Sequence, residues 1–371
     1  MENFSSDQNT LPDPYYNKPV YRKKTWFYLG FFVIFCLFLL TVVFVFIKKP
    51  AQIANEPFAS SGNVMATPTP TPMPFYEITI PYLREREYKS SLGDLQKTYE
   101  TQNYSAYVTS YDSDGLRVNG LLTQPKSEMP VGGWSAIIFV HGYIPPKSYQ
   151  TTQNYYDYVD FLARNGFVVF KIDLRGHGTS EGETGGAYYS SDYIVDTLNA
   201  YSALQSSSFI NPEKIGLWGH SMAGNVVMRS FAAKPEIRAV VVMAGAVYSY
   251  IDFREYGIND SSYRPPEMSS ERVRKRQQLI DTYGQPSRES VFWQQVAPTN
   301  YLSDLKGAIQ IHHATDDPVV SIDYSRNLIS LLNTKNVLNE FYEYPSGGHN
   351  LTGTSFTQSM QRTVNFFTNN L

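Results

Sequence analysis

The sequence predicts an α/β fold in which a doubly wound, mostly parallel sheet carries helices on both faces. Two observations lead to this prediction. From about residue 135 onward, short uninterrupted apolar runs recur, which is the pattern of strands buried on both faces. Longer segments with apolar residues at helical spacing lie between these runs. A regular alternation of the two patterns is typical of a parallel sheet covered by helices.

The elements follow from these patterns in chain order. A hairpin is predicted first, with strands at 105–111 and 116–124 around the turn residues Asp112, Ser113, Asp114 and Gly115. The predicted strands of the alternating region are 135–140, 167–174, 214–219, 238–244, 308–313 and 340–344. The predicted helices are 155–164, 190–205, 222–233, 322–332 and 355–367. Before the hairpin the pattern is mixed, and we expect residues 84–87 to lie on a solvated face.

One long stretch interrupts the alternation, and we interpret it as a small cap at about residues 248–307 of a domain spanning residues 76–371. About 60 residues is too long for an ordinary connection between two strands. The cap contains a charged helical segment at 270–283 with the basic residues Arg272, Arg274, Lys275 and Arg276. These side chains either line a solvated helix face or attract acidic substrates.

The N-terminal quarter has a different character. Residues 1–25 are polar and predict a disordered tail. Residues 26–47 form an uncharged apolar run of about 22 residues, long enough as a helix to cross a lipid bilayer. A cleaved signal peptide is the alternative, but the run is too long and no small-residue cleavage site follows it. Residues 48–75 contain alternating Thr and Pro and predict an extended stalk, with a docking ligand for a partner domain as the alternative.

The charges around the apolar run predict its orientation. Four basic residues precede it and two follow it closely, namely Lys18, Arg22, Lys23 and Lys24 before and Lys48 and Lys49 after. Because cytoplasmic flanks carry the excess of Lys and Arg, we expect a single-pass membrane protein. Its N-terminus would be cytoplasmic and its folded domain extracytoplasmic.

Composition narrows the functional classes. The net charge is only -3, and the sequence has no basic domain or nucleic-acid motif, so we expect no nucleic-acid partner. The single cysteine, Cys36, lies in the apolar run, which excludes disulfides within the chain, thiol catalysis and cysteine-rich metal sites. We expect neither a cofactor nor a metal, and the sequence does not indicate an oligomeric state.

A candidate nucleophile lies between the strand at 214–219 and the helix at 222–233. The residues Gly219, His220, Ser221, Met222 and Ala223 match the G-x-S-x-G turn with one substitution, Ala for the second glycine. Such a turn exposes the serine at the end of a strand and in front of a helix N-terminus, where negative charge is favoured. Ser221 is therefore the predicted nucleophile. The alternative is a chance Gly-Ser turn before a helix.

A serine nucleophile needs a base and a group that orients the base. His349 follows the last predicted strand, and the carboxyl ends of parallel strands are where catalytic groups meet. The acid is Asp316 or Asp317, which follow the preceding strand. A metal site that adds His312 and His313 to these aspartates is the rival, but neighbouring residues on a strand face opposite sides.

Acyl transfer also needs donors for the oxyanion of the tetrahedral intermediate. The backbone N–H of Met222 at the helix start is one candidate. The loop after the first buried strand contains His141, Gly142 and Tyr143, and its glycine allows a close approach. We expect the second donor to be the backbone N–H of Tyr143.

From residue 103 to 371 the sequence resembles the α/β-hydrolase superfamily, in which nucleophile, acid and base follow in the order Ser221, Asp317, His349. The loop at 173–182 and the segments at 297–301 and 311–317 resemble the catalytic domain of prolyl oligopeptidase-type serine peptidases and related esterases. The resemblance aligns the last segment with H-G-x-x-D, which implies that Asp317 is the acid, although Ala314 replaces the glycine. No β-propeller fits before residue 103, so the cap would have to control access.

These observations together predict a membrane-anchored serine hydrolase that forms an acyl-enzyme on Ser221. The resemblance favours a serine peptidase, with a carboxylesterase of the same fold as the alternative. The substrate would be a small ester or a peptide. A hydrolase-like binding module without activity is the third reading, and the complete set of Ser, Asp and His argues against it.

Overall fold

The computed structural model describes residues 73–259 and 268–371. The chain divides into two units, Met1–Thr69 and Pro70–Leu371, and all described residues belong to the second. Within the described ranges no helix is both long and apolar enough to cross a bilayer. The predicted tail, membrane span and nearly all of the stalk lie outside those ranges, so the anchor stays a prediction.

The described residues build a nine-stranded sheet in the order β1-β2-β3-β5-β4-β6-β7-β8-β9. The strands from β5 to β9 pair in parallel, and β1, β2 and β3 add antiparallel strands at one edge. Their bounds are β1 Gln96–Glu100, β2 Tyr104–Ser113, β3 Leu116–Pro125, β4 Trp134–Val140, β5 Val168–Ile172, β6 Ile210–His220, β7 Ala239–Met243, β8 Ala308–Ala314 and β9 Asn339–Tyr344. The sheet is therefore mostly parallel, as predicted.

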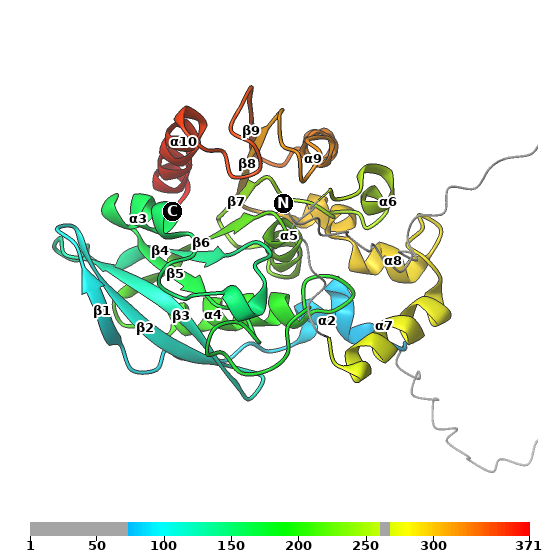
Figure 1. The fold of residues 1–371 in the computed structure, drawn as a ribbon, viewed down its shortest axis with the longest axis horizontal. Helices are drawn as coiled ribbons and strands as arrows, with labels where there is room; N and C mark the ends of the chain where they lie inside the picture. Colours follow the sequence, from blue (N-terminus) through cyan, green and yellow to red (C-terminus); the bar gives the residue numbers. More distant parts are fainter. Residues whose placement is uncertain (1–72, 260–267) are drawn as a thin grey trace, which may run out of the picture. The chain divides into compact units, whose positions relative to one another are not determined.

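Helices cover both faces of this sheet (Figure 1). The α-helices are α2 Ile80–Glu85, α3 Tyr156–Arg164, α4 Asp192–Gln205, α5 Ala223–Ala233, α6 Asp252–Tyr256, α7 Ser270–Tyr283, α8 Val291–Val296, α9 Asp323–Thr334 and α10 Thr354–Asn370. Three short 3-10 helices are η1 Tyr76–Ile78, η2 Pro146–Ser148 and η3 Pro298–Asp304. Helices α3 and α10 pack on one face, while α4, α5 and α9 pack on the other.

The central strands show why the sequence reads as unbroken apolar runs. In β4, Ile138 and Val140 belong to the core cluster under α4 and α5, whereas Ile137 and Phe139 belong to the cluster under α3 and α10. All four side chains are fully buried. Alternate residues of a strand point to opposite faces, so a strand between two helical layers needs apolar residues at every position. The doubly wound α/β prediction is confirmed.

The hairpin of β2 and β3 closes through a two-residue turn. Ser113 pairs with Leu116, and the turn residues Asp114 and Gly115 have φ angles of 57° and 78°. Two successive positive φ values are the requirement of a type I′ turn, which favours Asp-Gly. The hairpin was read correctly from the sequence, and β3 joins the parallel part of the sheet by pairing with β5.

The segment before the hairpin differs from the sequence prediction. It forms η1, α2 and β1. Residues 84, 85 and 87 are exposed and Arg86 is partly exposed, which agrees with the expected solvated face, but the two arginines also form ion pairs that were not predicted. Arg84 pairs with Asp304 at 2.8 Å and donates from Nε to the carbonyl of Ala232. Arg86 pairs with Asp114 in the hairpin turn. These partners lie far away in the sequence, so local polarity did not reveal them.

The stretch between β7 and β8, where the sequence predicts a cap, contains α6, α7, α8 and η3. Two of the four basic residues of α7 contact the body of the domain instead of only solvent. Arg272 donates to the carboxylate of Asp192 at 2.7 Å, and Arg276 lies over the ring of Tyr189 at 4.3 Å. These contacts tie α7 to the first residue of α4 and to the loop that precedes it.

A buried ion pair holds the beginning of the loop between β5 and α4. Arg175 donates from Nε and Nη2 to the carboxylate of Asp196 at 2.6 to 3.1 Å, and its backbone N–H donates to the same group. Asp196 is fully buried on α4. A buried carboxylate without such a partner would be costly, so this pair fixes the start of the loop at 173–182 against α4.

Candidate active site

The turn between β6 and α5 carries Ser221. Only two residues separate the last strand residue, His220, from the first helical residue, Ala223. Ser221 has a φ of 56°, a left-handed conformation that costs a non-glycine residue about 1–3 kcal/mol and is concentrated at functional sites. A Cβ on Gly219 would lie 2.8 Å from the carbonyl oxygen of Ala223 and 2.9 Å from Val227. The close passage of strand and helix therefore requires glycine at position 219.

The structure brings Ser221, His349 and Asp317 into one hydrogen-bonded row. The Oγ of Ser221 lies 2.8 Å from Nε2 of His349, and Nδ1 of His349 lies 2.8 Å from Oδ2 of Asp317. A carboxylate can only accept, so Nδ1 of His349 carries the proton. Nε2 is left to accept the hydroxyl proton of Ser221. This is the tautomer in which a histidine can act as a general base toward a serine.

The carboxylate of Asp317 is almost completely buried and surrounded by donors. Oδ1 accepts from the backbone N–H groups of Val319 at 2.8 Å and Val320 at 3.0 Å, and Oδ2 lies 3.2 Å from Nε2 of His313. Burial alone would raise the pKa of Asp317, but the hydrogen bonds from His313, His349 and Val320 outweigh it. They hold the pKa well below its usual range. The group is therefore ionised at neutral pH.

The neighbouring Asp316 binds the backbone of the loop that precedes His349. Its carboxylate accepts from the backbone N–H of Gly347 at 3.3 Å and of Gly348 at 2.8 Å. These two glycines precede His349 and have φ angles of 128° and 59°. The two aspartates point to different parts of the same loop, with Asp316 on its backbone and Asp317 on the ring of His349.

His312 and His313, the two histidines of the alternative metal site, face opposite sides of β8. His312 contacts Tyr344 through Nδ1 at 2.9 Å and Gln310 through Nε2 at 2.7 Å. His313 contacts Ser325 of α9 through Nδ1 at 2.7 Å. Alternation along the strand separates the rings, and His313 instead supports Asp317. The described residues contain no group of three or more His, Cys, Asp or Glu side chains arranged to hold a metal ion.

The two predicted oxyanion residues follow the carboxyl ends of two adjacent parallel strands, β4 and β6. Val140 at the end of β4 pairs with Gly219 near the end of β6, so Tyr143 and Met222 each lie three residues beyond this pair. Met222 is the N-cap residue of α5. A Cβ on Gly142 would lie 3.1 Å from the carbonyl oxygen of His220, so the β4 loop passes directly beside the turn of Ser221.

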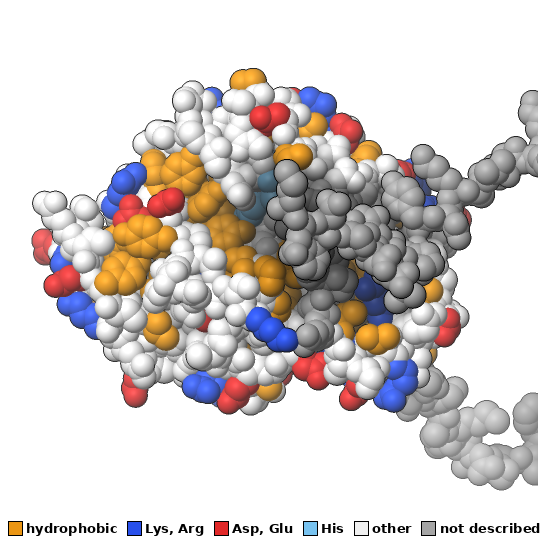
Figure 2. Space-filling model, viewed as in Figure 1, with side chains coloured by type: hydrophobic (Ala, Val, Ile, Leu, Met, Phe, Trp, Pro, Cys, Tyr) orange, Lys and Arg blue, Asp and Glu red, His pale blue; other side chains and the backbone are white. Residues whose placement is uncertain are grey.

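Of the six histidines, all within the described ranges, only His349 is not buried. Figure 2 shows one patch of histidine surface on the face that it displays, next to a region of apolar and aromatic side chains. A base that serves an external substrate needs access to solvent, and this exposure sets His349 apart.

The segment after α6 contacts the loop that carries Asp317. Ile258 forms an isolated antiparallel bridge with Val320, and the N–H of Asn259 donates to the carbonyl of Val319 at 2.8 Å. Both partners lie two or three residues after Asp317. The region predicted as the cap is therefore tied directly to the loop that carries the acid.

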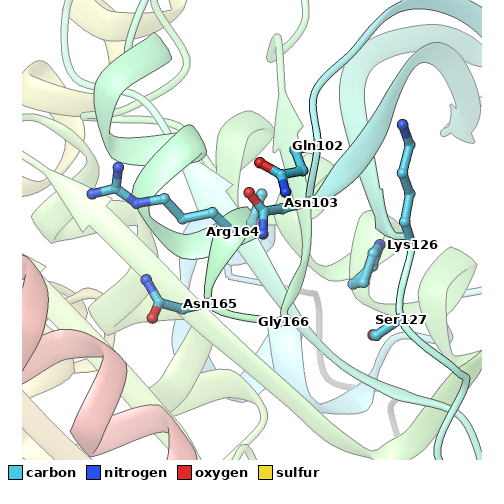
Figure 3. Close-up of a pocket in the computed structure, with 9 residues that line it drawn as sticks. Gln102, Asn103, Lys126, Ser127, Arg164, Asn165 and Gly166 are labelled. Atoms are coloured by element: carbon cyan, nitrogen blue, oxygen red, sulfur yellow. The ribbon is translucent and has the colours of Figure 1, made fainter.

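A separate surface pocket lies at the amino end of β5 (Figure 3). It is lined by side chains around the turn that precedes β5, including Gln102, Asn103, Lys126, Arg164 and Asn165. Ser221 follows a parallel strand, whereas this pocket adjoins the start of one. The pocket therefore takes no part in the site of Ser221.

Two family models match the chain. One, described as serine aminopeptidase, S33, matches residues 135–257. The other, described as BAAT / acyl-CoA thioester hydrolase C terminal, matches residues 198–369. The first match covers β4 to α6 and includes Ser221, and the second extends from α4 to α10 and includes Ser221, Asp317 and His349.

Curated relatives are distant. The thiohydrolase aneE of Aspergillus aculeatus is 26% identical over 195 residues, which cover 52% of this chain and 55% of that protein. The uncharacterized peptidase YtmA of Bacillus subtilis is 24% identical over 225 residues, which cover 61% of this chain and 78% of that protein. The chain thus spans little more than half the length of the first of these relatives.

Solved structures share the fold. The acetyl xylan esterase of Paenibacillus sp. R4 superposes with a TM-score of 0.56 at 18% identity, covering 77% of this chain and 91% of that chain. The dipeptidyl peptidase 4 of Porphyromonas gingivalis superposes with a TM-score of 0.54 at 19% identity, covering 73% and 36%. At these identities the likeness concerns the fold alone.

The mostly parallel sheet, the turn at Ser221 and the two family matches point to the same class of protein. This class comprises enzymes with a helix-covered parallel sheet and a serine at the end of one of its strands. The chain belongs to the α/β-hydrolase superfamily. The serine peptidases and esterases among its matches are consistent with a hydrolase.

Proposed function

We propose that the chain is a serine hydrolase that transfers an acyl group to Ser221 and then to water. Oγ of Ser221 attacks the carbonyl carbon while Nε2 of His349 takes the hydroxyl proton. The backbone N–H groups of Met222 and Tyr143 stabilise the oxyanion. His349 then returns the proton to the departing amine or alcohol as its bond to the acyl carbon breaks. Water activated by His349 finally hydrolyses the acyl-enzyme and releases the acid.

The observation that supports this proposal most is the pair of 2.8 Å contacts from Ser221 to His349 and from His349 to Asp317. Asp317 stays ionised and stabilises the imidazolium that forms when His349 accepts the proton. The left-handed backbone at Ser221 adds support, because it holds the hydroxyl at the end of β6 in front of α5.

A fluorophosphonate probe tests the proposal. We expect the wild-type chain to be labelled and Ser221→Ala to take up no label, because the probe reacts with an activated serine hydroxyl. Ser230→Ala is the matched control, since Ser230 lies on α5 and its buried hydroxyl has no partner among the described residues. This variant should label like wild type. Absence of label on wild type, or equal label on Ser221→Ala, would contradict the proposal and favour a binding module.

For the substrate class, we propose a peptidase, with a carboxylesterase as the second candidate. The serine aminopeptidase model and the dipeptidyl peptidase fold support the first, whereas the thioester hydrolase model and the esterase fold support the second. Turnover of aminoacyl and prolyl amides should be compared with that of short-chain p-nitrophenyl esters. Cleavage of esters without measurable cleavage of any amide would overturn the peptidase proposal.

We further propose that residues 26–47 anchor the enzyme in a lipid bilayer, with the hydrolase domain on the extracytoplasmic side. The support is the uncharged length of this run and the excess of basic residues before it. In right-side-out vesicles, added protease should digest the hydrolase domain and leave the N-terminal tail shielded. A digested tail with a shielded domain would reverse the orientation, and chain that washes off the vesicles would exclude the anchor.

A further inference from the structure

A continuous hydrogen-bonded path connects the three loops that meet at Ser221. The N–H of Gly142, in the loop after β4, donates to the hydroxyl of Tyr155 at 2.9 Å. That hydroxyl lies 2.7 Å from Nδ1 of His220, the residue before the nucleophile. Nε2 of His220 lies 2.9 Å from the carbonyl oxygen of His349. The path therefore starts beside Tyr143, passes through the turn of the nucleophile and ends on the backbone of the base.

Each proton on this path has one consistent position. A carbonyl oxygen can only accept, so Nε2 of His220 carries the proton and donates to His349. Nδ1 of His220 is then an acceptor for the hydroxyl of Tyr155, and that hydroxyl accepts from Gly142. Burial, together with the neighbouring ring of His349, lowers the pKa of His220 to about 3, so its ring is neutral as this arrangement requires. Every member has its partner, which makes the network rigid.

The network contacts the loop after β4 at a glycine. Position 142 must be glycine, because a Cβ there would lie 2.6 Å from the hydroxyl of Tyr155. Glycine gives the chain more backbone freedom at this point, and the hydrogen bond to Tyr155 fixes the peptide that ends at Gly142, directly before the peptide that carries the N–H of Tyr143. His349 likewise follows Gly347 and Gly348, so its carbonyl gains a fixed point through His220.

We infer that Tyr155 and His220 are positioning residues that hold the oxyanion loop and the loop of His349 in register with Ser221. The inference rests on the proposed serine hydrolase function and adds two residues to it. Neither side chain touches the reacting atoms. Both act through the backbone that places the N–H of Tyr143 and the ring of His349. Small displacements of such groups reduce the rate of the chemical step more than they reduce substrate binding.

Tyr155→Phe is the sharpest test, because it removes only the hydroxyl and keeps the ring that packs on Phe139 at 5.4 Å. We expect kcat on an ester or amide substrate to fall about 10- to 100-fold with KM within about twofold of wild type. The rate of fluorophosphonate labelling should fall by a similar factor. A thermal unfolding transition like that of wild type would show that the fold is intact.

Tyr158→Phe is the matched control. Tyr158 lies in the first turn of α3, which Tyr155 caps, and its hydroxyl donates to the carbonyl of Asn350, next to His349, at 2.6 Å. It does not belong to the path through His220, so we expect kcat within about twofold of wild type. An equal loss in both tyrosine variants would show that the path through His220 matters no more than any other hydrogen bond to this loop, and it would overturn the inference.

Variants of His220 give a second readout. His220→Gln keeps a donor that can reach the carbonyl of His349, whereas His220→Leu keeps none, so the glutamine variant should retain a higher kcat. Equal kcat in the two variants would contradict the role of this hydrogen bond. If wild type reacts with the probe but Tyr155→Phe reacts at the same rate, only the positioning role fails. If wild type itself does not react, the proposed function fails.

Discussion

Asp317→Asn is expected to lower kcat by about four orders of magnitude, the effect that removal of the orienting carboxylate has on a serine, histidine and acid triad. An asparagine can present its N–H₂ to Nδ1 of His349, which favours the tautomer with the proton on Nε2. The histidine could then no longer accept the proton of Ser221. Binding of substrate depends on other groups, so KM should change much less than kcat.

Asp316→Asn is the matched control for this prediction. The two residues are adjacent, but Asp316 accepts from the backbone N–H groups of Gly347 and Gly348. Its amide oxygen can still accept one of these bonds, so we expect at most about a tenfold loss of kcat. Steady-state kinetics of both variants with one p-nitrophenyl ester would measure the difference. A larger loss for Asp316→Asn than for Asp317→Asn would reverse the assignment of the acid.

Those two aspartates also show where sequence reasoning reached its limit. The strand before them and the loop of His349 were readable, because apolar periodicity and chain order are local signals. Which aspartate meets His349 depends on the path of a loop 30 residues later in the chain, so the residues themselves left both open. Only the resemblance to known hydrolases favoured Asp317. In the structure, Oδ2 of Asp317 lies 2.8 Å from Nδ1 of His349.

The positioning network lay beyond the reach of the sequence for a similar reason. Tyr155 is one of 29 tyrosines, and nothing in its neighbourhood distinguishes it. Its importance comes from the pairing of β4 with β6, which brings Gly142 next to His220. The ion pairs of Arg84 and Arg86 were missed in the same way, because their partners at 304 and 114 become neighbours only in the folded chain.

The buried histidines predict a strong dependence of stability on pH. His220 and His312 are almost fully buried, and their ring contacts suit the neutral form. Burial lowers the pKa of each to about 3, with the positive charge of Arg362 adding to the effect at His312. In the unfolded chain a histidine has a pKa of about 6.5. The unfolded state therefore binds more protons than the folded state between about pH 6.5 and pH 3.

The sign follows from this difference. Each group contributes its full stability above about pH 6.5, and this contribution is lost as the pH falls toward the folded value. Between pH 7 and pH 5 the loss is about 2 kcal/mol for each histidine, or about 4 kcal/mol for the pair. That is a large part of the 5–15 kcal/mol that stabilises an ordinary domain. Urea unfolding of the full chain in detergent should show a marked fall of the midpoint over this range.

His312→Gln isolates one of the two contributions without touching the site of Ser221. The amide can keep a hydrogen bond to Tyr344 or Gln310, but it does not titrate. We expect this variant to be less stable than wild type at pH 7, because a buried ring that fits its core is lost. Its loss of stability between pH 7 and pH 5 should nevertheless be smaller by about 2 kcal/mol. An equally steep loss in the variant would mean that His312 is not held neutral by the fold, and that other groups cause the acid sensitivity.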